Sequence, residues 1–173
     1  GIVEAFNYYN ESYEYNWNPD FDARSIVGDN PSDLSNLYYG NNDIEGPDAR
    51  HGTHVAGIVA AIRDNSKGSI GVANNVRIMS VRTVPNGDER DKDVANAIRY
   101  AVDNGADVIN MSFGKGQSPY KDYVDAAVRY AAKNDVLLVH GSGNDNREVQ
   151  FDDNYPNDRY AKSGLFRSKY ADN

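Results

Sequence analysis

The chain has 173 residues, enough for one domain with a sizeable hydrophobic core. Its formal net charge of −8 disfavours nucleic acids and anionic membranes as partners, because both are bound through basic surfaces. The absence of cysteine excludes a disulfide framework and a thiolate zinc site, and no stretch approaches the roughly 18 apolar residues that a membrane span requires.

Residues 1–50 are rich in Asn, Asp, Tyr and Ser and have no sustained apolar period. Asn, Asp and Gly satisfy turns through their own side chains, so we predict a Tyr/Asn-rich, irregular insertion here. The tyrosines and Trp17 carry apolar rings with polar tips, which anchor such a segment to a surface. A partly disordered segment is the alternative.

From residue 51 onward, apolar residues recur at the spacing of one helix face: Val55, Ile58, Val59 and Ile62. We predict a buried helix over residues 51–63, ended by the turn cluster 63–68. His51 then lies at the helix N-terminus, where the positive end of the helix dipole disfavours an added positive charge and leaves the ring available as a base. Gly52 beside it permits close approach of backbone or substrate.

The rest of the chain alternates between strand and helix patterns. Strands are predicted over residues 76–82, 107–112 and 136–139. One helix is predicted to be capped by Asp91 or Asp93, to end at Asn104-Gly105, and to have an apolar face formed by Val94, Ala97, Ile98, Ala101 and Val102. A second helix carries Val124, Ala127, Val128 and Ala131 and ends at residues 133–134. The alternation indicates right-handed crossovers, and hence an α/β fold in residues 51–173: a partial doubly wound parallel sheet of about three strands.

The carboxyl ends of the last two strands carry small and polar residues. They read Asn110-Met-Ser-Phe-Gly114 and His140-Gly-Ser-Gly-Asn-Asp145. Function gathers past strand ends in open parallel sheets, and small residues let an extended peptide lie close to the backbone. The amide of Asn144 is placed to donate a hydrogen bond to a developing oxyanion, or alternatively to make an ordinary Asx-turn.

The order of these segments resembles that of the subtilisin-like serine peptidases, or subtilases. The segment from Asp48 to Gly57, Asp-Ala-Arg-His-Gly-Thr-His-Val-Ala-Gly, resembles the histidine signature of that family. The two strand ends resemble its substrate-binding and oxyanion-asparagine segments, and the similarity runs over residues 48–145, including Gly71-Val-Ala73. The resemblance implies a subtilisin type of fold and peptide-bond hydrolysis by an Asp/His/Ser triad.

Carried over by position, the resemblance assigns a role to each matching residue. His51 is the general base and Asn144 the oxyanion donor. The segment Ser112, Phe113 and Gly114 pairs with the substrate backbone and forms one wall of the specificity pocket; Gly141, Ser142 and Gly143 form the other. Lys115 stands where family members often have a second glycine, which indicates a preference for more polar or acidic substrates.

Other residues are interpreted as structural. His54 lies three positions after His51, but the HExxH pattern fails, so it is predicted to be a core histidine rather than a metal ligand. His140 is expected to be packed and hydrogen-bonded. No cofactor and no metal site is predicted; calcium is possible but unsupported, because the acidic loop of Asp145, Asn146, Asp152, Asp153 and Asn154 lacks a recognisable ligand spacing.

Two parts of the triad have no good candidate in the chain. The nearest candidate for the acid is Asp29, which follows Ser25-Ile-Val-Gly28, but a turn is the better interpretation of this segment. Asp48 is interpreted as a residue that positions the helix start. The nucleophile segment Gly-Thr-Ser-Met-Ala is absent: Ser163 and Ser168 open no apolar helix, and Ser142 fails the GxSxG pattern. We therefore expect the acid and the nucleophile to lie outside this chain.

These patterns predict a fragment of a subtilisin-like serine endopeptidase, a secreted, periplasmic or cell-surface hydrolase by resemblance, that acts on extended polypeptides and is inactive alone. The alternative is a catalytically dead subtilase relative serving as a peptide-binding or scaffold module. An unrelated nucleotide-binding domain is disfavoured, because neither GxGxxG nor GxxxxGK occurs. Exposed sheet edges and apolar helix faces would make the fragment marginally stable or self-associating.

Overall fold

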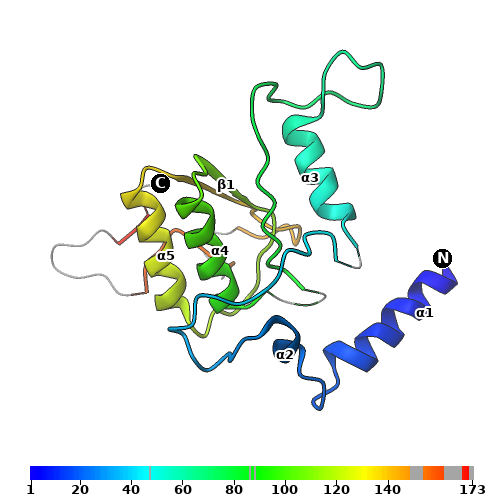
Figure 1. The fold of residues 1–173 in the computed structure, drawn as a ribbon, viewed down its shortest axis with the longest axis vertical. Helices are drawn as coiled ribbons and strands as arrows, with labels where there is room; N and C mark the ends of the chain where they lie inside the picture. Colours follow the sequence, from blue (N-terminus) through cyan, green and yellow to red (C-terminus); the bar gives the residue numbers. More distant parts are fainter. Residues whose placement is uncertain (47, 86, 88, 149–153, 162–168, 172–173) are drawn as a thin grey trace.

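The computed structural model describes residues 1–46, 48–85, 87, 89–148, 154–161 and 169–171. In chain order its elements are α1 (Ile2–Glu11), the π-helical turn η1 (Ser12–Asn16), α2 (Ala23–Val27), α3 (Arg50–Ala60), α4 (Asp91–Asp103), β1 (Val108–Met111), α5 (Lys121–Lys133) and β2 (Leu137–His140). In Figure 1, α4 and α5 lie side by side in front of the strands, whereas α3 and α1 stand apart from them. None of the described helices is long and apolar enough to cross a membrane.

The hydrophobic core lies between α4, α5 and the two strands. Both helices end as predicted, with Asn104 and Asn134 as C-caps. Alanines without exposed surface stand at the contact, which lets the helices approach closely. The buried cluster consists of Val94, Ala95, Ile98, Val102, Met111, Val124, Ala127, Val128, Ala131 and Val136. Ala97 of the predicted face is only partly buried, and Ala95 is buried in its place.

The caps predicted for α4 are wrong. Its N-cap is Arg90, which makes no side-chain capping bond. Asp91 instead accepts hydrogen bonds from the backbone N–H of Tyr120 at 2.7 Å and from Ser118 Oγ at 3.0 Å, which ties the start of α4 to the start of α5. Asp93 faces the N-terminal segment.

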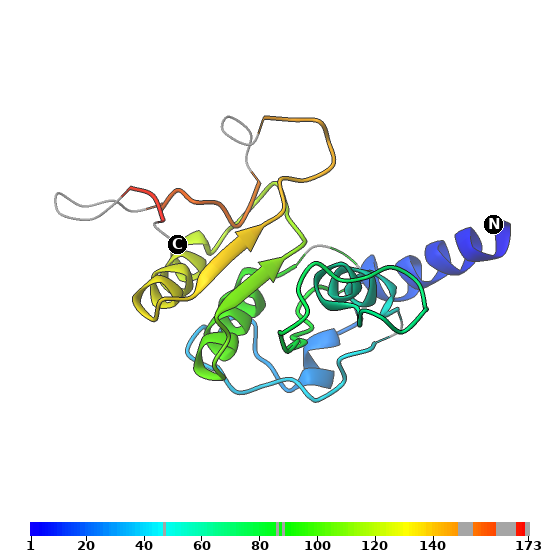
Figure 2. The same cartoon turned by 90° about the horizontal axis from the view of Figure 1, so that it is seen from above.

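The sheet confirms the predicted parallel α/β class in a reduced form. β1 and β2 pair in parallel, with Val108 opposite Leu137 and Met111 opposite His140, and α5 provides the crossover between them. Seen from above in Figure 2, the two arrows run side by side with both helices on one flank. Ile109 and Leu138 pack on the core, while Val108, Leu137 and Val139 face away and are about half exposed. The nearly continuous apolar sequence of both strands is typical of a sheet that is covered on both faces. The described residues cover only one face of this sheet.

The third predicted strand is not formed. Residues 76–82 have no strand assignment, and Val76 and Ile78 are about half exposed. An alternating pattern specifies a strand only where a neighbour supplies the inter-strand hydrogen bonds, and the described residues place none beside this segment.

The helix that carries His51 is shorter and more exposed than predicted. α3 ends at Ala60 instead of residue 63, and none of its residues is buried. Its apolar period specifies a helix correctly, yet Ile58 is 55% exposed. The prediction of a buried helix is therefore wrong for this chain.

The carboxyl end of α3 is fixed by the loop that follows it. The backbone N–H groups of residues 71–73 donate to the carbonyls of Ala61, Ile58 and Val59 at 2.8–3.0 Å. The Arg63 guanidinium donates to the carbonyls of Gly71 and Val72. An added Cβ at Gly71 would overlap the backbone of Ala60 and Ala61, so this close approach requires a glycine.

The first fifty residues are partly irregular and partly helical. Residues 2–16 form α1 and η1, contrary to the prediction of irregular structure. The signal missed is the helical spacing of four exposed apolar residues, Ile2, Phe6, Tyr9 and Tyr13. Residues 18–48 confirm the predicted turn chemistry: side-chain oxygens accept from the N–H two residues onward at Asn18, Asp22, Asn30, Asp33, Asn36, Asn41, Asp43 and Asp48.

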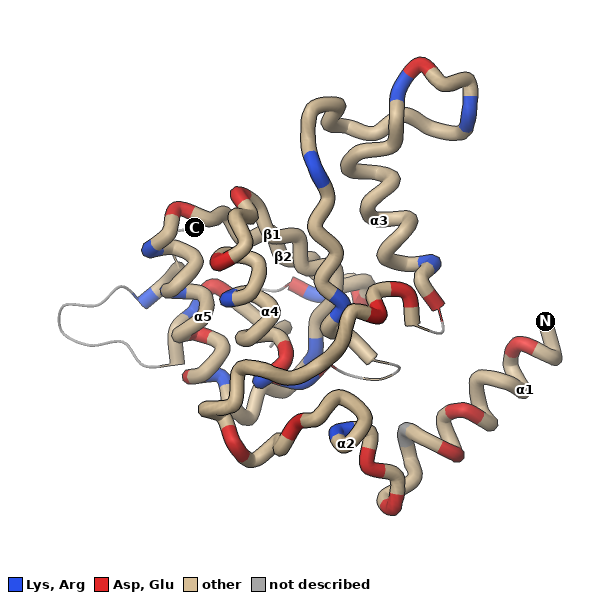
Figure 3. Tube along the Cα trace, viewed as in Figure 1, with Lys and Arg blue, Asp and Glu red and all other residues tan. Residues whose placement is uncertain are grey.

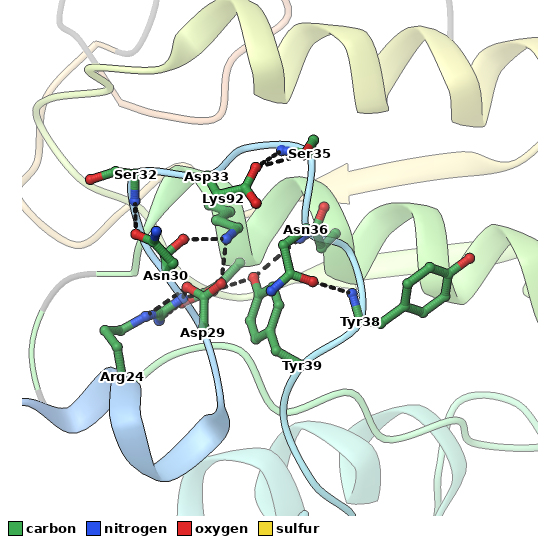
Figure 4. A network of polar contacts seen from close by, with 12 residues as sticks. Arg24, Asp29, Asn30, Ser32, Asp33, Ser35, Asn36, Tyr38, Tyr39 and Lys92 are labelled. Carbon is green, nitrogen blue, oxygen red and sulfur yellow. Dashed lines mark hydrogen bonds and ion pairs between the residues drawn. The ribbon is translucent and has the colours of Figure 1, made fainter.

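A buried polar network joins this segment to α4 (Figure 4). Asp29, which follows Gly28 at the end of α2, is ion-paired with both Arg24 and Lys92, and its side chain is fully buried. Arg24 also binds Asp93 in a bidentate arrangement at 2.7 and 2.8 Å. Burial raises the pKa of Asp29, but hydrogen bonds and charges from Lys92 and Arg24 outweigh it and leave that pKa below its ordinary value.

One tyrosine completes the network. The Tyr39 hydroxyl donates to Asp93 at 2.5 Å, and its ring lies under Lys92 and Arg24. Tyr39 thus anchors the segment as predicted for the tyrosines, whereas Trp17 and Tyr38 are exposed. Figure 3 shows only acidic charges along α1; Arg24 of α2 is the first cation of the sequence.

Candidate functional site

The two segments predicted to form the pocket walls are neighbours in space. Each follows a strand of the parallel pair, and the N–H of Gly141 donates to the carbonyl of Met111 at 3.1 Å, which extends the pairing to the strand ends. Ser112 and Gly114 are exposed, as are residues 141–143. Both segments therefore present exposed residues at the carboxyl edge of the sheet, where an extended peptide can lie.

Asn144 follows a glycine turn at this edge. Gly143 has a φ of +85°, a conformation that favours glycine, and it redirects the chain immediately before Asn144. Asn144 is exposed, and its carboxamide makes no hydrogen bond to any residue that the structure describes. Among these residues the Asx-turn alternative is not formed, and they leave the side-chain amide available to donate to a ligand.

Phe113 and His140 pack against each other next to the carboxyl edge of the sheet. Their rings meet edge to face, with centroids 6.2 Å apart, and Phe113 packs on the core. Burial lowers the pKa of His140, which a hydrogen bond to the Phe113 backbone partly offsets. The prediction of a packed, hydrogen-bonded His140 is confirmed in part, because its buried Nε2 has no hydrogen-bond partner within the described part of the chain.

His51 lies in the first turn of α3, a helix that stands apart from the two strands in Figure 1. As predicted, Asp48 positions the helix start: its Oδ1 accepts from the N–H of Arg50 at 2.8 Å. His51 is exposed, and no described side chain is hydrogen-bonded to it. His54 is also exposed, so its predicted place in a core is wrong for this chain. The structure thus brings the two wall segments together, whereas no hydrogen bond links His51 to Asn144 among the residues that it describes.

Two charged residues singled out in the sequence are engaged by partners within the fold. Both Asp29 oxygens are engaged by cations, so this carboxylate orients no histidine here. The Lys115 ammonium is directed at the start of α4, where it pairs with Asp91 at 2.8 Å and donates to the Glu89 carbonyl at 2.6 Å. Its side chain is 9% exposed, so the ammonium is engaged at the start of α4, and the preference for polar or acidic substrates stays a prediction.

The acidic loop is only partly within the described residues. Asp145 and Asn146 are exposed, and Asn146 has a φ of +54°. Asp152 and Asp153 lie outside the described residues, as do Ser163 and Ser168. No group of three or more His, Asp or Glu side chains suited to a metal ion occurs in the described part of the chain.

One residue at the edge was missed as a wall component. Asn154 extends between the two wall segments and donates to the Gly141 carbonyl at 3.1 Å. Its sequence context, in an acidic loop of no recognised pattern, gave no signal of this position, because its neighbours Gly141 and Gly114 lie 13 and 40 residues away and are brought to it only by the fold.

Comparison with known proteins agrees with the resemblance. A sequence model of the Subtilase family matches residues 15–165. A thermophilic serine proteinase of Bacillus sp. (strain AK1) is 39% identical over 139 residues, which cover 78% of this chain and 31% of that protein.

Two relatives from Bacillus subtilis (strain 168) are also similar. Its cell wall-associated protease is 37% identical over 115 residues, 66% of this chain and 12% of that protein. Its major intracellular serine protease is 36% identical over 129 residues, 73% of this chain and 39% of that protein. The chain therefore spans well under half of the length of each relative.

Proposed function

Because the chain belongs to the subtilase family, we propose that it carries the general base and the oxyanion donor of a serine endopeptidase that cleaves extended polypeptides. The observation that supports this most is the parallel pairing of β1 and β2. It sets Ser112–Gly114 beside Gly141–Asn144, and at the same edge no described residue is hydrogen-bonded to the Asn144 carboxamide.

In the proposed mechanism, the substrate backbone pairs with the segment Ser112–Gly114. His51 takes the proton of a serine hydroxyl as that oxygen attacks the peptide carbonyl, and it returns the proton to the leaving amine. Asn144 donates to the oxyanion of the tetrahedral intermediate, a contact that is stronger in the transition state than in the ground state. The exposure of His51 is compatible with a role that needs a partner from another segment.

We propose that segments not present in this chain supply the acid and the nucleophile. Asp29, the nearest sequence candidate for the acid before His51, is already paired with two cations. The sequence contains no Gly-Thr-Ser-Met-Ala segment, and the chain covers 31% of the thermophilic proteinase. The chain by itself then hydrolyses nothing, because a base without its nucleophile forms no acyl-enzyme.

The compartment also remains a proposal. The name of the cell wall-associated relative supports placement outside the cytoplasm, whereas the name of the intracellular relative supports the opposite. We retain a secreted, periplasmic or cell-surface location, which the fractionation of cells that express the complete gene tests.

The function is tested with the protein expressed from its complete gene. We expect a fluorophosphonate probe to label one serine that is not in this chain. His51→Ala should lower kcat by about 10⁶-fold, as expected when one member of a triad is removed, and Asn144→Ala by about 10²–10³-fold. Asn104→Ala at the helix C-cap is the matched control and should leave kcat unchanged.

A wild-type protein that neither reacts with the probe nor cleaves an unfolded protein such as casein would contradict the proposal. Retained binding of extended peptides in that case would point instead to a catalytically inactive peptide-binding module.

A further inference from the structure

The segment that follows β1 is held at its far end by a single residue. Ser112–Gly114 lies beyond the strand pairing, and none of its backbone groups bonds to the backbone of another described residue. Lys115 comes next and forms an antiparallel bridge with Tyr155, whose N–H donates to the Lys115 carbonyl at 2.9 Å. The exposed segment is therefore fixed by β1 at one end and by Lys115 at the other.

The side chain of Lys115 anchors this end of the segment inside the protein. Its ammonium pairs with Asp91 at 2.8 Å and donates to the Glu89 carbonyl at 2.6 Å. Asp91 is itself held by the hydroxyl of Ser118 at 3.0 Å and by the N–H of Tyr120 at 2.7 Å. The Lys115 and Asp91 side chains are 9% and 3% exposed, so water and salt screen their attraction only weakly. The start of α4 thus holds the end of the exposed segment through a buried ion pair.

The residues on both sides of Lys115 are flexible. Gly114 and Gly116 flank it and are exposed, and glycine loses more conformational freedom on ordering than any other residue. Family members often have a glycine at position 115 as well. A glycine there would place three glycines in succession and leave no side chain to bind Asp91. The lysine of this chain therefore fixes the backbone at a point where the family pattern provides no such anchor.

We propose that Lys115 is a positioning residue, whose ion pair with Asp91 holds the backbone of Ser112–Gly114 in place for pairing with the substrate. This inference rests on the proposed function, in which that segment binds the substrate backbone. Because the segment is ordered before the substrate arrives, less conformational entropy is lost when the two pair. A peptide long enough to pair with the segment gains from this order, whereas a single amino acid does not.

The test uses the protein expressed from its complete gene and two chromogenic substrates, a blocked single amino acid and a blocked tetrapeptide. Both end in the same residue and carry the same leaving group, and kcat/KM for the tetrapeptide is compared with kcat/KM for the single amino acid. The wild type should prefer the tetrapeptide, and Lys115→Met should lower this preference by about tenfold, because the segment must then be ordered during binding. Lys115→Arg keeps a cation opposite Asp91 and should retain most of the preference.

The matched control is Lys92→Met, which removes an ammonium from an equally buried ion pair at the residue next to Asp91. The partners of Lys92, Asp29 and the Asn30 carbonyl, belong to the N-terminal segment, so this variant should lose stability but keep the preference. Thermal unfolding gives the temperature below which each variant is folded and can be assayed. If Lys115→Met does not fold, Asp91→Asn serves in its place, because it removes the charge that Lys115 binds but keeps the size of the side chain. A loss of at least about threefold in the preference is then expected.

Three results would overturn the inference alone: a wild type that cleaves both substrates equally well, a Lys115 variant with an unchanged preference, or an equal loss of kcat/KM for both substrates. A similar change of preference in Lys92→Met would also overturn it, because that ion pair does not reach the strand ends. A wild type that cleaves neither substrate would overturn the proposed function, and this inference with it.

Discussion

α3 and the pair formed by α4 and α5 have similar apolar periods in the sequence but different surroundings in the structure. α4 and α5 bury their apolar faces against each other and against β1 and β2. α3 buries none of its residues, although Val55, Ile58 and Val59 recur at the same helical spacing. An apolar period thus specifies that a helix forms and which face is apolar, but not what covers that face.

The same difference separates the packed strand ends, which carry Asn144, from the exposed helix, which carries the proposed general base. The well-packed region supplies the rigid strand ends that carry the wall segments and Asn144. The exposed helix carries His51 and is held mainly at its carboxyl end by residues 71–73. Catalysis in the proposed enzyme would therefore require that other segments fix the amino-terminal end of α3.

The largest effect is expected from truncating a core side chain. Ile98→Ala removes a side chain that is 2% exposed and should lower the free energy of unfolding by about 4 kcal/mol. Ile58→Ala, the same change in α3, should cost less than about 1 kcal/mol, because Ile58 is 55% exposed. Urea unfolding followed by circular dichroism measures both. Equal losses would show that α3 is buried in solution.

The next largest effect concerns the network that joins the N-terminal segment to α4. Asp29→Ala leaves Lys92 and Arg24 buried without their shared carboxylate and should cost about 3 kcal/mol. The matched control is Asp43→Ala, which removes an exposed ion pair with Arg82 and should cost much less. The same urea titrations decide this; similar losses would mean that the network is accessible to water.

Acid should weaken the same network. The pKa of Asp29 lies below its ordinary value of 3.8, so the unfolded chain binds more protons than the folded one in acid. The stabilisation is therefore complete above about pH 4 and is lost as the pH falls through the folded-state pKa. Unfolding measured from pH 6 to pH 2 should show a smaller acid-dependent loss in Asp29→Asn than in the wild type. An identical pH dependence would contradict the assignment.

The smallest effect is expected within α3. Nothing lies within 4 Å of a Cβ built on Gly57, so Gly57→Ala should stabilise the helix by about 1 kcal/mol through propensity. Gly71→Ala is the contrasting change, because its Cβ would overlap the backbone at the end of α3 and should be destabilising. Amide hydrogen exchange in residues 53–60 reports both. A destabilising Gly57→Ala would reveal a close neighbour on that face.

Much of the fold could be predicted where the sequence pattern and the local chemistry agree. The ends of α4 and α5 were predictable because Asn104 ends the first helix and Asn134 the second. The Asx-turns of residues 18–48 were predictable because each backbone donor lies two residues after the side chain that accepts its hydrogen bond. α1 was missed because Asn and Tyr dominate its composition and obscure the spacing of Ile2, Phe6 and Tyr9.

The sequence by itself determined the family, the order of the site segments and the identity of most elements, because these depend on short motifs and on periods of two or 3.6 residues. Only the tertiary structure decided that residues 76–82 form no strand, that Lys115 faces Asp91, and that Asn154 lies between Gly114 and Gly141. Each of these depends on a partner that is distant in the chain, and distant partners leave no local trace in the sequence.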